Sequence, residues 1–257
     1  MEERCPTTAR TASMPPPGGA GPVVWLFHSL LADAGSCAPL AERLSATHRV
    51  MLADLPGFGG SAKAGPGLDA VADAMAPAIA AAGAPAAIIG NGYGSFVALA
   101  VAMRHPHLVS RLVLAGAGAA FSEPGRAAFR GMEAAAGQHG LAAIADTAMR
   151  RLFAPDFQAA NPALLAERRA RFLATDLDVF TGACLELAGM DMRDRVASLA
   201  LPVLVIVGAE DEATPPPMAR ELVGLLPNAR LIELPGCAHV PQLQDTDKFY
   251  AALDGFI

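Results

Sequence analysis

A strand, a tight turn and a helix around residue 92 form the clearest chemical signal in the sequence. The apolar run 86–89 leads into GNGYG at residues 90–94, and a helical pattern follows from Ser95. Glycines two residues before and after the apex let the strand and helix approach closely, and the apex residue of such a turn points above the sheet. The amide after the apex lies at a helix N-terminus, where it can stabilise an oxyanion. The spacing predicts a nucleophile turn, but its apex, Gly92, has no side chain and cannot form an acyl-enzyme.

An acid and a base follow in the second half of the chain. The segment GAEDEATP at 208–215 comes directly after the apolar run 203–207, and its spacing selects Asp211. The segment GCAH at 236–239 ends in His239, just before the last helical pattern. A histidine can take and return a proton while a carboxylate holds its tautomer. Asp211 and His239 are therefore the predicted proton-handling pair.

The order turn, acid, histidine resembles the α/β-hydrolase family. The resemblance extends from about Val23 to Ile257, and His28-Ser29-Leu30 stands where many members carry His-Gly in the oxyanion loop. The Ser-Leu pair and the position of the inserted helices are most similar to enol-lactone hydrolases of the 3-oxoadipate type, then to carbon–carbon bond hydrolases and small esterases. The resemblance implies a hydrolase of small carboxylic esters or lactones. It also implies that the amides of Tyr93 and of Ser29 or Leu30 hold the oxyanion.

His28 has two possible roles at this stage. It is a candidate substrate-binding residue, and it could instead hold the oxyanion loop by hydrogen bonds to the backbone. The cap arginines offer a second candidate contact, because one of them could reach a substrate carboxylate. The alternative for each arginine is that it lies on a solvent-exposed helix face and contacts no substrate. These arginines are Arg126, Arg130, Arg150, Arg151, Arg168, Arg169 and Arg171.

Glycine at position 92 leaves three interpretations open. The chain is an engineered inactive hydrolase, a natural protein that kept binding without catalysis, or a serine-independent lyase, isomerase or cyclase that uses His239 and Asp211 as its base. Glycine relieves backbone strain at the apex and is expected to leave a small hole where a hydroxyl would be. Three other possible nucleophiles, Ser95, Cys37 and Cys237, are expected to pack in the core or to cap a helix. Ser29 is expected to contact the substrate rather than to attack it.

The elements that must position these residues alternate between strand and helix. Near-continuous apolar strands of this kind predict a parallel sheet covered on both faces, here a three-layer α/β-hydrolase fold with a mostly parallel sheet of at least six strands and an inserted helical cap. Strands are expected at 23–27, 49–53, 86–89, 112–114, 203–207 and 229–234. Helices are expected at 39–46, 68–82, 95–104, 127–136, 141–153, 162–174, 179–188, 218–226 and 246–257. The predicted division is an N-terminal tail at 1–20, a core at 21–120 and 198–257, and a cap at 121–197.

Composition excludes several other classes of protein. The 257 residues are 53% hydrophobic with a net charge of −6, which argues against disorder and against nucleic acid as a partner. No apolar run reaches the roughly 20 residues of a membrane span, and the polar start lacks the apolar core of a signal peptide, so a cytoplasmic protein is expected. No nucleotide, flavin or metal motif is present. A small-molecule substrate without a cofactor is the prediction; the sequence specifies no oligomeric state.

Overall fold

Six parallel strands make a single sheet in the order β2-β1-β3-β4-β5-β6. The computed structural model describes residues 21–257, and the predicted tail at 1–20 lies outside the described residues. All six predicted strands are confirmed, with small extensions at their ends. They are β1 Val23–Phe27, β2 Arg49–Ala53, β3 Ala86–Asn91, β4 Val109–Ala115, β5 Val203–Gly208 and β6 Ala229–Leu234.

Alternate residues of the central strands point into two separate cores. One row of paired residues runs across β1, β3, β4 and β5 and belongs to one buried cluster. Its members are Leu26, Ile89, Val113 and Leu204. The preceding residue on each strand belongs to the other cluster. Because successive strand side chains point to opposite faces, this sheet is buried on both sides, which explains its near-continuous apolar strands.

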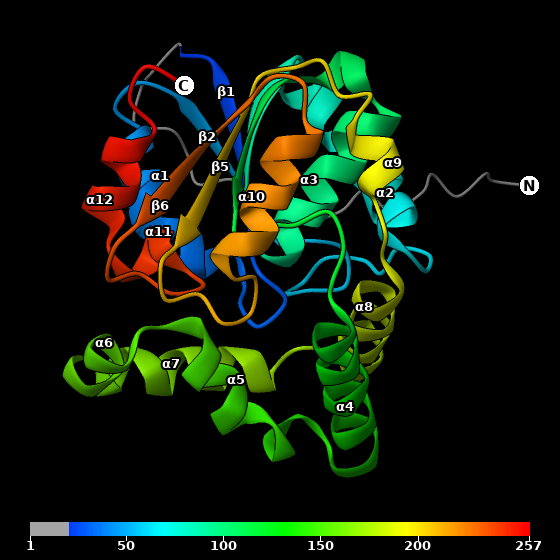
Figure 1. The fold of residues 1–257 in the computed structure, drawn as a ribbon, viewed down its shortest axis with the longest axis vertical. Helices are drawn as coiled ribbons and strands as arrows, with labels where there is room; N and C mark the ends of the chain where they lie inside the picture. Colours follow the sequence, from blue (N-terminus) through cyan, green and yellow to red (C-terminus); the bar gives the residue numbers. More distant parts are fainter. Residues whose placement is uncertain (1–20) are drawn as a thin grey trace, which may run out of the picture.

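Helices cover both faces of the sheet (Figure 1). The helices α1, α11 and α12 lie on one face, and α2, α3 and α10 on the other. Outside the predicted cap, the bounds are α1 Ala38–Leu44, α2 Leu68–Gly83, α3 Tyr93–Arg104, α10 Pro216–Leu225, α11 Pro241–Gln244 and α12 Thr246–Ala252. The helix predicted at 246–257 therefore ends early, and the short α11 before it was not predicted.

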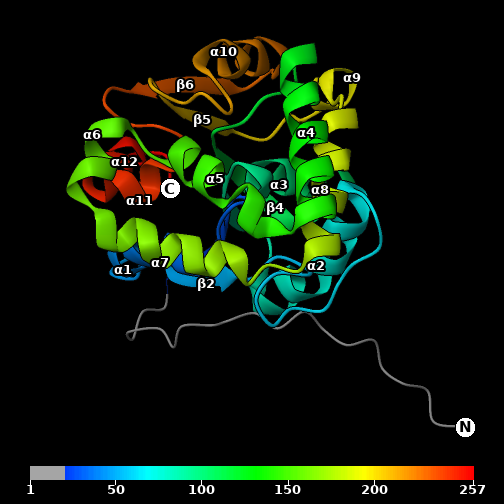
Figure 2. The ribbon, with the colours of Figure 1, turned by 90° about the horizontal axis from the view of Figure 1, so that it is seen from below.

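Most of the helices inserted between β4 and β5 lie at the carboxyl ends of the strands (Figures 1 and 2). They are α4 Glu123–His139, α5 Ala145–Leu152, α6 Pro155–Ala160, α7 Pro162–Leu173 and α8 Leu177–Gly189. The short α9 Arg193–Val196 lies away from this end, beside α3 and α10. Ligands bind at this end of parallel sheets. We propose that residues 121–197 form a cap over a core of 21–120 and 198–257.

A buried ion pair connects this cap to the sheet. The Arg168 guanidinium of α7 lies 2.8 Å from the Asp33 carboxylate, which follows β1, and the arginine side chain is only 6% exposed. This arginine therefore does not lie on a solvated helix face. Its position is structural, so Arg168 is not available for contact with a substrate carboxylate.

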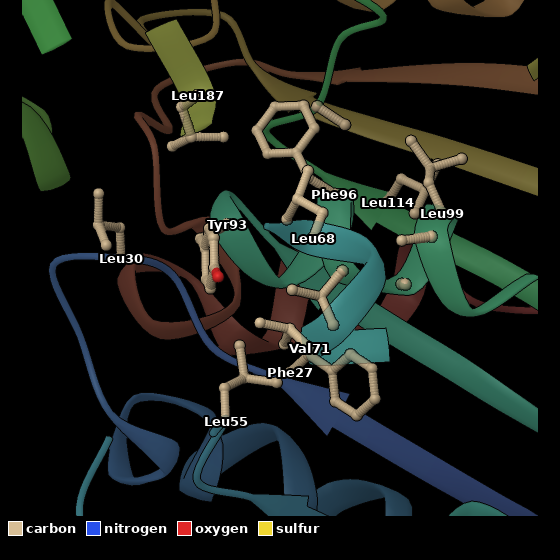
Figure 3. Close-up of a cluster of buried hydrophobic side chains, with 14 of the residues drawn as sticks. Phe27, Leu30, Leu55, Leu68, Val71, Tyr93, Phe96, Leu99, Leu114 and Leu187 are labelled. Atoms are coloured by element: carbon tan, nitrogen blue, oxygen red, sulfur yellow. The ribbon is translucent and has the colours of Figure 1, made fainter. Parts of the chain in front are cut away.

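The core below the cap contributes to the floor of the candidate site. Figure 3 shows Phe27 of β1 and Val71 of α2 packed beside the start of α3, with Tyr93 and Phe96 above them. Leu30 and Leu187 approach from the loop after β1 and from α8. The apolar core therefore extends to the place where the sheet meets the cap.

Candidate active site

The turn between β3 and α3 carries glycine at three positions, where a side chain would be strained or would clash. Gly92 has φ 52° and ψ −118°, in a region that residues with side chains rarely adopt. A Cβ at Gly90 would lie 2.5 Å from the carbonyl oxygen of Gly94, and one at Gly94 would lie 2.4 Å from that of Phe27. The strand and helix can cross this closely only because these residues lack side chains. The predicted turn is present, and α3 begins at Tyr93, two residues before the predicted start.

Asp211 and His239 meet at the end of the sheet as a hydrogen-bonded pair. The Nδ1–H group of His239 donates to Oδ2 of Asp211 at 2.9 Å, and both residues are buried. The backbone amides of Ala213 and Thr214 donate to Oδ1 of Asp211 at 2.8 and 2.9 Å. The Thr214 hydroxyl donates to Oδ2 at 2.7 Å. This carboxylate is fully engaged and fixes the imidazole with Nε2 free to handle a proton.

The environment of Asp211 lowers the pKa of its carboxyl group. Burial alone would raise this pKa, but the neighbouring His239 and the hydrogen bonds from His239 and Thr214 outweigh that effect. The folded state therefore favours the ionised carboxylate more than the unfolded chain does. This ionised carboxylate stabilises the fold above the ordinary pKa of 3.8, and the contribution disappears as the pH falls through the lower folded value.

Substituting Asp211→Asn should therefore cost more stability at pH 7 than at pH 3. At neutral pH the change removes the stabilising carboxylate. Below the ordinary pKa of 3.8 the same group in the unfolded chain takes up a proton, so the wild type has already lost part of that stabilisation at pH 3. Denaturant unfolding at both pH values measures the difference. The exposed Asp254→Asn variant is the control and should show equal, small effects at both. An equal loss at both pH values for Asp211→Asn would contradict the assigned carboxylate interactions.

Asn91 and Gln242 position the histidine loop, and sequence reasoning did not single them out. The Asn91 side-chain amide donates to the His239 carbonyl at 2.8 Å, and the Gln242 amide donates to Asn91 Oδ1 at 3.2 Å. Both residues are buried at 2% exposure. The sequence does contain a signal for Asn91, because it is a polar residue directly before the apex glycine at the end of an apolar strand. A buried polar side chain in that position needs hydrogen-bond partners.

The predicted hole at Gly92 is filled, which corrects the expectation from the sequence. A Cβ on Gly92 would lie 2.7 Å from Ser29 Oγ and 2.8 Å from His239 Nε2. Those two atoms are 3.4 Å apart, and the Ser29 hydroxyl donates to His239 Nε2. The serine hydroxyl and the imidazole therefore occupy the space that a side chain at residue 92 would need.

His28 is not among the residues that line the cavity, and its predicted substrate contact remains a prediction. It is fully buried, its Nδ1–H group donates to the Ser29 carbonyl at 2.9 Å, and its Nε2 accepts from the Leu55 amide at 3.1 Å. Burial lowers the pKa of His28, which favours this neutral form. With both ring nitrogens used, His28 holds the oxyanion loop against the turn after β2, as the alternative interpretation expected.

The amides proposed for the oxyanion lie next to this pair. The amide of Gly94 donates to the His28 carbonyl at 3.0 Å and so ties the start of α3 to the loop that carries Ser29 and Leu30. Tyr93 is the first residue of α3, so its amide has no acceptor within the helix. Ser29, Leu30 and Tyr93 all border the same cavity. Their role in holding an oxyanion remains a prediction.

A cavity of about 410 Å³ lies between the sheet and the cap and opens onto His239. Gly92 and Ser29 line its floor, and the rest of the wall is mostly apolar. The cap and its entry segment contribute Phe121, Pro124, Ala128, Phe129, Met132 and Leu187. Two charged side chains border it, Arg151 and Glu212. Its size and lining suit a small molecule with an apolar body.

The other candidate nucleophiles are occupied elsewhere. The Ser95 hydroxyl donates to the Ala115 carbonyl at 2.9 Å, and the residue is fully buried. Burial raises the pKa of the Cys37 thiol to about 12 and also raises that of Cys237. Thiols with raised pKa values are poor nucleophiles. All three residues pack within the core, as expected.

Within residues 21–257, no group of three histidine, cysteine, aspartate or glutamate side chains could hold a metal ion. None of the helices in this range has the length and apolar character that crossing a bilayer requires.

The chain belongs to the α/β-hydrolase fold family, whose model matches residues 22–246. This confirms the family resemblance drawn from the turn, the acid and the histidine. The fold and the arrangement of the site therefore agree on the class of protein.

Two relatives that are esterases by name and one solved structure of a lactonase resemble the chain over most of its length. The chain is 34% identical to a pimeloyl-[acyl-carrier protein] methyl ester esterase of Aromatoleum aromaticum, with 88% of this chain and 89% of that protein covered. It is 32% identical to the protein of the same name from Neisseria meningitidis, covering 91% and 93%. The enol-lactonase of Burkholderia xenovorans has a TM-score of 0.86 at 28% identity, covering 95% and 94%.

Proposed function

We propose that this protein hydrolyses carboxylic esters or lactones by a reaction in which residue 92 supplies no nucleophile. The observation that carries the proposal is the buried His239–Asp211 pair, joined at 2.9 Å and facing the cavity under the cap. The names of the similar esterases and of the enol-lactonase support this substrate class.

The reaction follows from what each group can do. His239 Nε2 takes a proton from the attacking hydroxyl and later returns one to the leaving oxygen. Asp211 holds the tautomer and stabilises the imidazolium that forms. The amides of Tyr93 and Leu30 donate to the oxygen that becomes negative in the tetrahedral intermediate. The apolar cavity excludes water around these groups, which strengthens their electrostatic interactions.

Hydrolysis assays on purified protein test the proposal. A panel of p-nitrophenyl esters of short acids and simple lactones should include substrates that the wild-type chain turns over. A chain that binds such molecules without turnover would favour the non-catalytic interpretation. Isomerisation or elimination of an acidic substrate without ester cleavage, dependent on His239, would favour the serine-independent lyase or isomerase. Either outcome would overturn the proposed hydrolase.

Arg151 is proposed to recognise a carboxylate on the acyl part of the substrate. It is half-buried at the cavity, and within residues 21–257 no carboxylate pairs with it, whereas Asp146 pairs with Arg169. We expect Arg151→Ala to raise KM about 10- to 100-fold for the mono-p-nitrophenyl ester of glutarate, since a charge-assisted hydrogen bond contributes ~1.5–3 kcal/mol. The KM for p-nitrophenyl butyrate should stay unchanged.

The adjacent Arg150 provides the matched control. It is exposed and donates to the Thr147 hydroxyl on the same helix, so Arg150→Ala should alter neither KM. Steady-state kinetics of both variants on both esters separates charge recognition from a general effect on α5. Equal losses on the acidic and the neutral ester would refute carboxylate recognition by Arg151.

A further inference from the structure

The Ser29 hydroxyl holds the position from which a nucleophile would face His239. Its Oγ is 3.4 Å from His239 Nε2 and 2.7 Å from the point where a Cβ of residue 92 would stand. Ser29 also borders the cavity. The 3.4 Å separation is long for a hydrogen bond, but catalytic hydrogen bonds in free enzymes are commonly long and shorten when substrate binds.

The groups around Ser29 match those that a nucleophilic serine requires. Its base is His239, and His239 is oriented by Asp211 at 2.9 Å, which completes a chain of serine, histidine and aspartate. The next residue, Leu30, also borders the cavity, and we expect its amide to donate to an oxyanion, as the amide after the nucleophile does in a nucleophile turn. The loop itself is fixed by the His28 hydrogen bonds to Ser29 and Leu55.

We propose that Ser29 is the nucleophile of this protein and that glycine at residue 92 provides the space for its hydroxyl. This inference rests on the proposed hydrolase function. Ser29 Oγ loses its proton to His239 Nε2 and forms a bond to the carbonyl carbon. The C–O bond to the leaving group then breaks, and His239 protonates the departing oxygen. Water next gives a proton to His239, its oxygen attacks the acyl carbon, and the released Ser29 oxygen regains the proton.

Active-site labelling tests the assignment directly. Wild-type protein is treated with an activated fluorophosphonate, and peptide mass spectrometry locates the adduct. We expect one adduct, on Ser29, and at least a tenfold loss of labelling rate in Ser29→Ala. Rapid quenching during turnover of a p-nitrophenyl ester should also trap the acyl group on the peptide that contains Ser29.

Ser36→Ala is the matched control, because Ser36 is also buried and lies seven residues further along, with its hydroxyl donated to the Asp33 carbonyl at 2.7 Å. It should label at the wild-type rate. Near-ultraviolet circular dichroism of each variant reports whether its tertiary structure is intact.

The possible failures are distinguishable. Ester hydrolysis that needs His239 but survives in Ser29→Ala, with no adduct on Ser29, would overturn the nucleophile and leave the hydrolase standing. An adduct at another residue would overturn it as well. Absence of any hydrolysis by the wild-type chain would instead count against the proposed function.

Discussion

His239→Ala is expected to lower kcat/KM for ester hydrolysis by about 10²–10⁴-fold, the contribution of a well-placed general acid–base group. The imidazole is the one group in the described site whose free nitrogen, Nε2, faces both Ser29 Oγ and the apex of the turn. Its removal leaves Ser29 Oγ without the imidazole that would accept its proton. Initial rates on the preferred p-nitrophenyl ester measure the loss.

Two further variants make the result interpretable. His239→Gln keeps much of the side-chain volume but cannot act as a base at neutral pH, so it should be as inactive as the alanine variant. The exposed His107→Ala variant should retain full activity. Near-wild-type rates in both His239 variants would show that His239 is not the general base.

Gly92→Ser should destabilise the fold by about 2–6 kcal/mol. A side chain at φ 52° costs ~1–3 kcal/mol. Its Cβ also has to displace Ser29 Oγ and His239 Nε2 from 2.7 and 2.8 Å, and overpacking of this kind costs ~1–3 kcal/mol. Chemical denaturation of the variant and the wild type measures the change. A serine side chain at residue 92 should also disturb the hydrogen bond between Ser29 and His239.

A double-mutant cycle isolates the steric part of this effect. Ser29→Ala removes the hydroxyl that a side chain at residue 92 would meet, so the double variant should be about 1 kcal/mol more stable than the sum of the single changes predicts. In the double variant the fluorophosphonate adduct should move to residue 92.

The matched control for the stability change is Gly131→Ser on α4, where a Cβ meets nothing within 4 Å. It should leave stability unchanged or slightly higher. Additive single effects would show that Ser29 does not fill the space at residue 92.

The architecture could be predicted because it depends on local patterns. Continuous apolar strands alternating with helices define a sheet buried on both faces, and the register rows confirm that arrangement. The glycine spacing around residue 92 reflects a backbone crossing too close for side chains. The short helices α6, α9 and α11 were not predicted, because segments of four to six residues carry too little periodicity to identify.

The roles of individual side chains required the tertiary structure. Arg168 and Arg151 look alike in the sequence, yet one is buried against Asp33 and the other borders the cavity. Likewise, the sequence does not show that both ring nitrogens of His28 form hydrogen bonds with the backbone.

The chain's own residues determined the family, the sheet and the pair of Asp211 and His239, because strand patterning and glycine spacing act over a few neighbouring positions. Only the folded structure placed Ser29 beside a histidine 210 residues away and filled the space above Gly92. That contact depends on how two loops from distant strands pack at one end of the sheet, and no local pattern encodes the distance between them.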